Sequence, residues 1–188
     1  MIKIIKIIFL SFFLSYTFLS SAFTSEIYHK QKLEKFFLEL KKSKEIEEAK
    51  NIERNIWTLW NLHPKSEFLT NKLKLGTELM ENGQHNYAHK IFSNIIFEDP
   101  NWSEAWNKRA TVLFLMKKYE LSLKDIDKTL DLEPRHFGAL SGRAQIYIEL
   151  KEYEKALNNL IQTKEIYPLS NGTKVIPKLE KILDIEKI

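Results

Sequence analysis

The feature that most constrains this chain is a repeat of 34 residues. Pro100, Pro134 and Pro168 stand at this interval. Further columns recur at the same spacing: Gly76, Ala110 and Ala144; Ala88, Ser122 and Ala156; Phe92, Ile126 and Leu160. A fixed period of this length means that each unit is one supersecondary element that cannot bury its apolar face alone, so neighbouring units must stack. The repeat therefore predicts an all-α array of helix pairs, which offers an extended surface for other chains.

The periodic part divides into three units over residues 69–102, 103–136 and 137–170. Each unit predicts two helices, separated by a short break near Asn82-Gly83, Met116-Lys117 or Leu150-Lys151. Asn101 stands three residues before Glu104, which resembles a capping box at the start of the middle unit. Residues 171–188 follow with one more amphipathic helix, which we expect to cap the C-terminal end of the array, because an end unit needs a cover over its apolar face.

Residues 23–68 predict two helices that do not follow the period. Leu33, Phe36, Phe37 and Leu40 form one apolar stripe on a helix over about residues 27–42. A second helix begins near Ile46 and ends before His63-Pro64, because the residue before a proline avoids helical geometry. We expect this N-terminal pair to pack on the first repeat as a cap, with its aromatic residues in the core.

The first 22 residues have the pattern of a secretory signal peptide. Lys3 and Lys6 precede an apolar run over residues 7–19, and the small residues up to Ala22 fit a cleavage site. An alternative is an uncleaved anchor, since residues 4–23 are just long enough to span a bilayer. Either interpretation predicts that the rest of the chain is exported, and a chain without cysteine suits an oxidising compartment.

Charge and motifs argue against several function classes. Without the leader, 27 basic and 25 acidic groups remain of the 29 and 25 in the whole chain, so no excess of positive charge predicts nucleic-acid binding. His85 and His89 have a spacing that suits a metal, but their columns hold Tyr119 and Leu123 in the next repeat, which indicates packing positions. No phosphate-binding loop or nucleophile motif is present. We therefore predict no metal, no cofactor, no small-molecule substrate and no enzymatic activity.

The repeat residues carry a family resemblance. The segment Ala105-Trp106-Asn107-Lys108-Arg109-Ala110, followed by Leu113, Tyr119, Ser122, Ile126 and Pro134, resembles a tetratricopeptide repeat. The whole chain, with its leader, is similar to small exported tetratricopeptide proteins of Gram-negative bacteria. This resemblance implies a periplasmic, right-handed α-solenoid, with a concave face formed by the first helix of each repeat.

On that face the resemblance implies a site for an extended peptide or partner protein. Glu104 is among the positions that it assigns to the concave face. The candidate binding residues are Thr77, Asn107, Lys108, Thr111, Gly138, Ser141, Gly142 and Gln145. Members of the family that capture a C-terminal carboxylate carry basic residues and Asn where this chain has Gly138, Gly142 and Thr77, so that ligand is not expected.

Two functions remain open. One is a periplasmic adaptor that docks a protein in the groove, and the other is a membrane-anchored assembly or structural factor that keeps its N-terminal apolar segment. The pair Gly138 and Gly142 also has two interpretations. The missing side chains let either a neighbouring part of the chain or a bound peptide lie against the helix.

Overall fold

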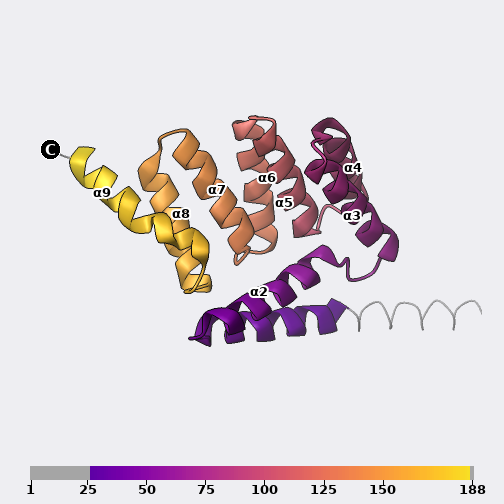
Figure 1. The fold of residues 1–188 in the computed structure, drawn as a ribbon. Helices are drawn as coiled ribbons and strands as arrows, with labels where there is room; N and C mark the ends of the chain where they lie inside the picture. Colours follow the sequence, from indigo (N-terminus) through magenta and orange to yellow (C-terminus); the bar gives the residue numbers. More distant parts are fainter. Residues whose placement is uncertain (1–25, 187–188) are drawn as a thin grey trace, which may run out of the picture.

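The computed structural model describes residues 26–186, which contain helices and turns and no strand. From the start of the described residues the chain is helical as far as residue 42. This segment is followed by α2 (Ile46–Asn61), α3 (Glu67–Glu81), α4 (His85–Glu98), α5 (Ser103–Leu115), α6 (Tyr119–Leu132), α7 (Phe137–Glu149), α8 (Tyr153–Ile166), the short 3₁₀ helix η1 (Asn171–Val175) and α9 (Ile176–Glu186). Three hairpins, α3–α4, α5–α6 and α7–α8, stack side by side (Figure 1), so the predicted α-solenoid is confirmed.

Small residues let the two helices of each hairpin approach closely. A Cβ atom on Gly76 would lie 2.6 Å from Cε1 of Phe92, which packs directly over it. In the second hairpin the equivalent residue Ala110 is 3% exposed, and its carbonyl accepts a 2.7 Å hydrogen bond from the Ser122 hydroxyl. The 34-residue columns of small residues are therefore contact positions between paired helices.

The turns inside the hairpins also follow the period. Gly83, Lys117 and Lys151 stand 34 residues apart, and their φ angles are 73°, 58° and 60°. This left-handed backbone costs a non-glycine residue roughly 1–2 kcal/mol. The breaks predicted near these positions are present, but nothing in the two lysines indicated left-handed backbone, which only their column with Gly83 could have suggested.

Polar contacts join successive hairpins. The Arg109 guanidinium donates to both carboxylate oxygens of Asp125 at 2.7 and 2.8 Å, and it also reaches the Ser93 hydroxyl on α4 at 3.2 Å. One repeat later, Arg143 donates to Asn159 and to Asp127. A bidentate arginine–carboxylate pair fixes orientation as well as distance, so Arg109 and Asp125 set how α5 lies on α6 within one hairpin. The contacts with Ser93 and Asp127 are the ones that reach the preceding hairpin.

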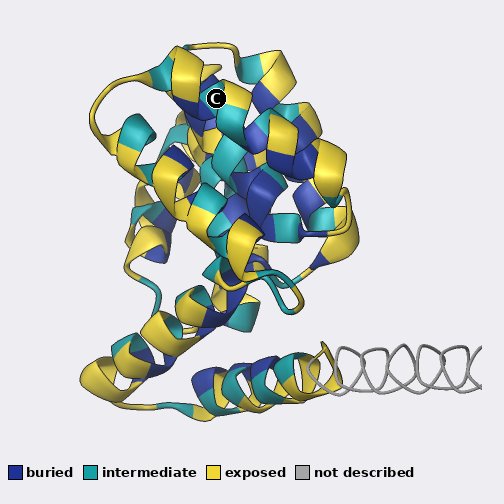
Figure 2. Ribbon diagram, turned by 90° about the vertical axis from the view of Figure 1, so that its right-hand side faces the viewer, coloured by how far each residue is buried: buried dark blue, intermediate teal, exposed yellow. Residues whose placement is uncertain are grey.

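The N-terminal pair does not cap the first repeat. It lies along the edge of the array that is formed by the loops between successive repeats, which we call the inter-repeat edge. In Figures 1 and 2 this pair lies below the hairpins. Its apolar side chains form one buried cluster, which holds Leu33, Phe37, Leu40, Ala49, Ile52, Ile56, Leu59 and Trp60 together with Phe137 and Tyr167. Because Phe137 opens the third repeat and Tyr167 ends it, the complementary surface for this stripe lies along the inter-repeat edge.

The C-terminal end of the array is covered by α9. Ile176 and Leu179 are 8% and 2% exposed, and they pack against Ala156 and Leu160 of α8. None of the helices in the described part of the chain is long and apolar enough to cross a bilayer. The predicted leader, residues 1–22, lies outside the residues that the structure describes.

Candidate functional site

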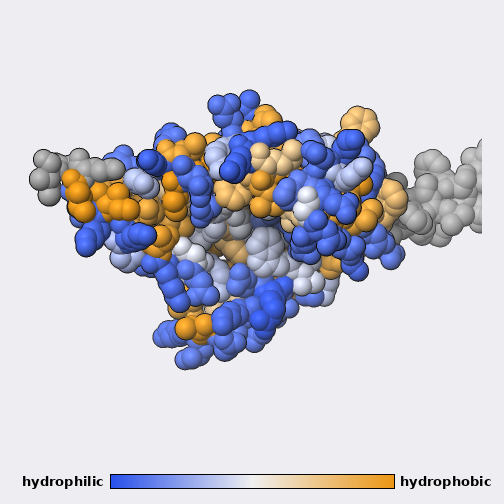
Figure 3. All heavy atoms as spheres, turned by 45° about the horizontal axis from the view of Figure 1, so that its top comes forward, coloured by the Kyte–Doolittle hydropathy of each residue, from blue (hydrophilic) through white to orange (hydrophobic). Residues whose placement is uncertain are grey.

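The first helices of the three hairpins, α3, α5 and α7, lie next to one another and form the surface that we call the groove. A hollow of about 150 Å³ opens between α5, α6 and α7. Five of the eight candidate residues line it: Asn107, Thr111, Gly138, Gly142 and Gln145. Figure 3 shows a recess lined by residues of intermediate hydropathy and surrounded by both hydrophilic and hydrophobic residues.

A second hollow, of about 560 Å³, lies between α2 and α3. Thr77 lines it together with Leu73 from the same helix and Trp57 from α2. The exposed side chains of Lys74, Glu78 and Glu81 stand at this hollow too. The contribution of α2 was not predicted, because the sequence placed the N-terminal pair at the end of the array.

The two glycines of α7 differ in their surroundings. A Cβ atom on Gly138 would lie 2.4 Å from Cη2 of Trp57, so this glycine makes room for the indole of α2. At Gly142 the nearest atom to such a Cβ, Cδ1 of Ile126, is 4.0 Å away. The packing interpretation therefore holds for Gly138, whereas Gly142 is open to the hollow.

Glu104 was predicted on the concave face and is instead completely buried. Its Oε2 accepts a hydrogen bond from the Asn107 amide at 3.1 Å and lies 2.9 Å from Nε2 of His136. Its Oε1 accepts no hydrogen bond within the described residues, although the Lys108 ammonium stands 3.4 Å away as an ion-pair partner. The capping box is also absent: Trp102 is the N-cap of α5 and makes no side-chain cap bond.

His136 is the buried residue that connects the groove to the N-terminal pair. Its Nδ1 accepts a hydrogen bond from the backbone N–H of Ala139 at 3.1 Å, so the ring proton is on Nε2 and is donated to Glu104. The ring stacks on Trp60 with centroids 3.9 Å apart and planes 8° apart. Sequence reasoning gave His136 no role of its own, and its only signal was a polar residue in the column of Phe68 and Trp102.

The two remaining candidates are less central. Lys108 lines neither hollow, because its ammonium is directed to Glu104. Ser141 is partly exposed on α7 and also lies outside both hollows. The structure thus brings together five candidates in one hollow, places Thr77 in the other, and leaves two beside them.

Comparison with known proteins fits this architecture. No protein-family model matches the chain. A TPR repeat-containing protein of Rhizobium etli is 34% identical over 113 residues, which are 60% of this chain and 55% of that protein. The chain thus spans about half the length of this curated relative.

Solved structures share the fold. The first TPR of Spaghetti (RPAP3) bound to an HSP90 peptide has a TM-score of 0.60 at 20% identity, covering 63% of this chain and 95% of that one. The Sgt2 TPR domain from Aspergillus fumigatus also scores 0.60, at 13% identity and over 65% and 83% of the two chains. The Yersinia enterocolitica secretion chaperone SycD, in complex with a peptide of YopD, scores 0.57 at 16% identity and covers 65% and 97%.

The described residues have the tetratricopeptide repeat fold. Within its described residues, no group of three or more histidine and carboxylate side chains is arranged to hold a metal ion. The groove is the surface on which the first helices of all three tetratricopeptide repeats meet, so it is the candidate functional site.

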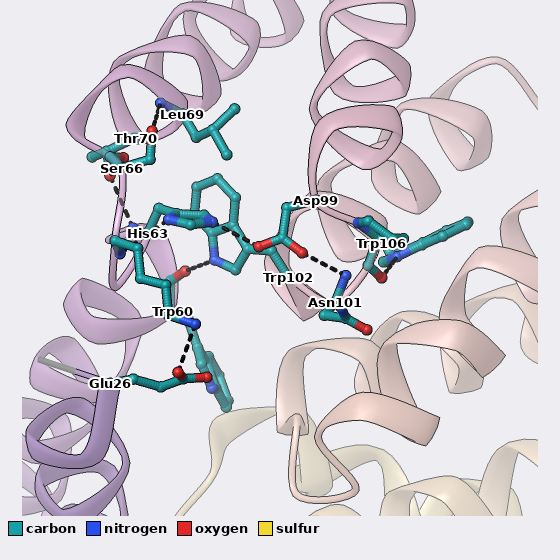
Figure 4. A network of polar contacts seen from close by, with 12 residues as sticks. Glu26, Trp60, His63, Ser66, Leu69, Thr70, Asp99, Asn101, Trp102 and Trp106 are labelled. Carbon is teal, nitrogen blue, oxygen red and sulfur yellow. Dashed lines mark hydrogen bonds and ion pairs between the residues drawn. The ribbon is translucent and has the colours of Figure 1, made fainter. Parts of the chain in front are cut away.

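A polar junction holds α2 beside the first tetratricopeptide repeat (Figure 4). The indole N–H of Trp102 donates to the Trp60 carbonyl at 3.0 Å, and Nε2 of His63 lies 2.8 Å from Asp99. These two contacts join the end of α2 to the loop between the first and second repeats. They therefore fix the wall that α2 contributes to the larger hollow.

Two further contacts tie the N-terminal pair to later loops. The Arg135 guanidinium donates to Glu34 at 2.8 Å, and the Tyr167 hydroxyl donates to Glu53 at 3.1 Å. Burial, together with the charge of Glu53, raises the pKa of Tyr167 to about 12. Because the phenol stays neutral beside the carboxylate, the pKa of Tyr167 reports whether α2 is docked against the loop after the third repeat.

Proposed function

We propose that this tetratricopeptide protein is a non-enzymatic interaction module of the cell envelope, an adaptor that binds an extended peptide or partner protein in the groove. The observation that carries the proposal is the pair of hollows on the groove side, which first helices of all three repeats line. Surface formed from several repeats in a row suits a ligand that runs along the array.

Proteins of the same fold support this choice of ligand. The RPAP3 domain is bound to an HSP90 peptide, SycD to a peptide of the translocator YopD, and the TPR2B domain of yeast Sti1 is in a complex described as pHsp70. The identities lie between 16% and 20%, so the likeness extends to the fold and the partner of this chain is a separate question.

The chemistry of the groove favours hydrogen bonding with a few charges. Thr111 and Gln145 offer hydroxyl and amide groups around the smaller hollow, and Gly142 leaves the α7 backbone accessible, whereas the buried Asn107 amide already donates to Glu104. Lys108 is paired with Glu104, which reduces its value as a free anchor for a carboxylate. A peptide held by its backbone and side-chain amides fits this surface better than an acidic chain end.

The cellular location rests on the leader. A signal peptide cleaved after Ala22 makes the protein periplasmic, whereas an uncleaved segment over residues 4–23 makes it a membrane-anchored assembly or structural factor. N-terminal sequencing or the intact mass of the exported protein distinguishes these forms. A chain that begins at Phe23 favours the soluble adaptor, and an intact leader favours the anchored alternative.

Site-specific photo-crosslinking in cells tests the groove. A photoreactive residue at Gln145 or at Thr77 samples the two hollows, and one at Lys128, exposed on α6, is the matched control. We expect both groove positions to capture the same protein and Lys128 not to capture it. Equal capture from all three positions, or none from the groove, contradicts the proposal.

A variant that fills the smaller hollow provides a second test. Gly142→Leu places a side chain where the nearest atom to a Cβ is 4.0 Å away, so the fold should tolerate it. Crosslinking from Thr77 should then decrease while the melting temperature stays unchanged or rises. Undiminished capture with a filled hollow assigns the partner to another surface.

A further inference from the structure

The N-terminal end of the array carries an apolar face that nothing within residues 26–186 covers. Phe68 and Leu75 lie seven residues apart on one side of α3 and are 65% and 48% exposed. Tyr87, on the adjoining side of α4, is 63% exposed. Figure 2 views the molecule from this end. We call these three residues, together with Ile91, Lys72 and Glu98, the end face.

The end face differs from the next repeat at four of its columns. Lys72 and Glu98 stand where that repeat has Trp106 and Leu132, whereas two other columns change from polar to apolar. Leu75 stands where the later repeats have Arg109 and Arg143, and Ile91 stands where they have Asp125 and Asn159. Within the array each of those pairs joins the two helices of one hairpin, and its arginine also reaches the preceding hairpin, at Ser93 and at Asp127. Terminal repeats normally need a polar outer face for solubility. Here Phe68 and Leu75 remain exposed at the terminal repeat, which indicates that the end face is itself a contact surface.

Two charged residues of the end face form an ion pair. The Lys72 ammonium on α3 lies 2.6 Å from a carboxylate oxygen of Glu98 at the end of α4, and 5.2 Å from the centroid of the Phe68 ring. The end face thus carries one ion pair among its apolar residues, and the Lys90 ammonium stands beside it, 5.9 Å from the centroid of the Tyr87 ring. A second copy related by a twofold axis presents the same pair in reverse order, so that Lys72 of each copy can meet Glu98 of the other.

The other end of the molecule cannot supply the complement. There α9 buries Ile176 and Leu179 against α8 and presents exposed polar residues such as Lys178 and Lys181 to solvent. The helix α9 therefore prevents the end face of one copy from packing on α8 of another in a head-to-tail stack. An end face that meets its own copy buries apolar surface on both sides and forms a closed pair.

We propose that two copies of this protein associate through the end face, α3 and α4 of one against α3 and α4 of the other, about a twofold axis. The association is independent of the function proposed for the groove. It joins two grooves in one particle, so a partner that carries two copies of a recognition segment is held at both.

The decisive variant exchanges end-face residues for those that the fold already uses in the next repeat. Leu75→Arg with Ile91→Asp installs the pair formed by Arg109 and Asp125, so the hairpin should fold as before. Sedimentation equilibrium of the exported protein, with its form identified by intact mass, should give the mass of two copies. The double variant should weaken association by roughly tenfold or more, because it places charges in the apolar contact.

Phe97→Asp is the control. Phe97 is 89% exposed, lies on a different side of α4 from Tyr87 and Ile91, and has Asp131 in its column of the next repeat. Its replacement should leave association unchanged while removing a comparable apolar side chain. Circular dichroism and melting temperature confirm that both variants are folded.

Charge exchange then tests whether the partner is a second copy. Lys72→Glu gives two carboxylates on the end face and Glu98→Lys gives two cations, so each variant alone should associate weakly. An equimolar mixture should associate as a mixed pair. The proposal is overturned if the exported protein is a single copy at every concentration, if the double variant still pairs, or if the mixture associates no better than its components.

Discussion

The two ends of the repeat array are finished in opposite ways. At the C-terminal end, α9 buries Leu179 to 2% exposure against α8. At the N-terminal end, Phe68 and Leu75 stay 65% and 48% exposed although a pair of helices precedes the first repeat. That pair lies instead along the inter-repeat edge, where Phe137 and Tyr167 complete its core. An extra helix next to a repeat array is therefore a cap only where its apolar stripe finds its complement at the array's end.

The largest expected difference between the two ends is in stability. Leu179→Ala removes a buried side chain and should lower the free energy of unfolding by roughly 2–5 kcal/mol. Leu75→Ala at the bare end should cost less than about 1 kcal/mol, because its side chain is half exposed. Chemical denaturation of both variants measures the contrast. Similar losses at the two ends would mean that the bare end is covered as tightly as the capped one.

The middle of the array provides a reference for both ends. Ala110 is 3% exposed where α5 meets α6, so Ala110→Leu overpacks that contact and should cost roughly 1–3 kcal/mol. Thermal melting measures the loss. An unchanged melting temperature contradicts the assignment of the Gly76, Ala110 and Ala144 column to the helix contact.

Two glycine substitutions on α7 compare the inter-repeat edge with the groove. Gly138→Ala forces the Trp57 ring away from a position 2.4 Å from the new Cβ and should lower stability by about 1–3 kcal/mol. Gly142→Ala meets open space and should raise it by about 1 kcal/mol, since alanine is the better helix former. Opposite shifts in melting temperature are expected. Shifts of the same sign would show that the two positions share one environment.

The smallest effect concerns the edge itself. The pKa of Tyr167 is raised to about 12 by burial and by Glu53. Below pH 10 this phenol is neutral in both folded and unfolded chains. Between pH 10 and about 12 only the unfolded chain ionises, so its contribution to stability is lost as the pH rises through that interval.

Glu53→Gln should lower the pKa of Tyr167 part of the way back, since burial remains. Ultraviolet titration of tyrosinate measures this change, and Tyr167→Phe identifies the signal. If the late titration persists unshifted in the glutamine variant, the contact between α2 and the loop after the third repeat is not the one described.

Sequence predicted the features that the 34-residue period controls. The hairpins, the small-residue contacts and the tetratricopeptide fold follow from columns such as Gly76, Ala110 and Ala144, because every repeat confirms the others. The burial of Glu104 could not be found in this way. It depends on His136, 32 residues further along, and on Trp60, which lies outside the period altogether.

The sequence placed candidate residues near one another but did not predict the shape of the surface. Five of the first-helix positions, all in the second and third repeats, lie at one hollow. Trp57 was assigned to a core, and its presence at both Gly138 and the larger hollow depends on where α2 docks. The direction of an amphipathic helix relative to its neighbours is a tertiary property that a single apolar stripe leaves undetermined.

The position of the N-terminal pair also has a mechanical consequence. In an array of repeats each unit contacts only its neighbours, so the superhelix can change its curvature and twist, and it can unfold from one end. Here Glu34 is bound to Arg135, 101 residues later, and Glu53 to Tyr167, 114 residues later. The N-terminal pair therefore connects the loops that end the second and third repeats. Both contacts oppose a change in the curvature of the array, and unwinding of the last repeat would separate Tyr167 from Glu53.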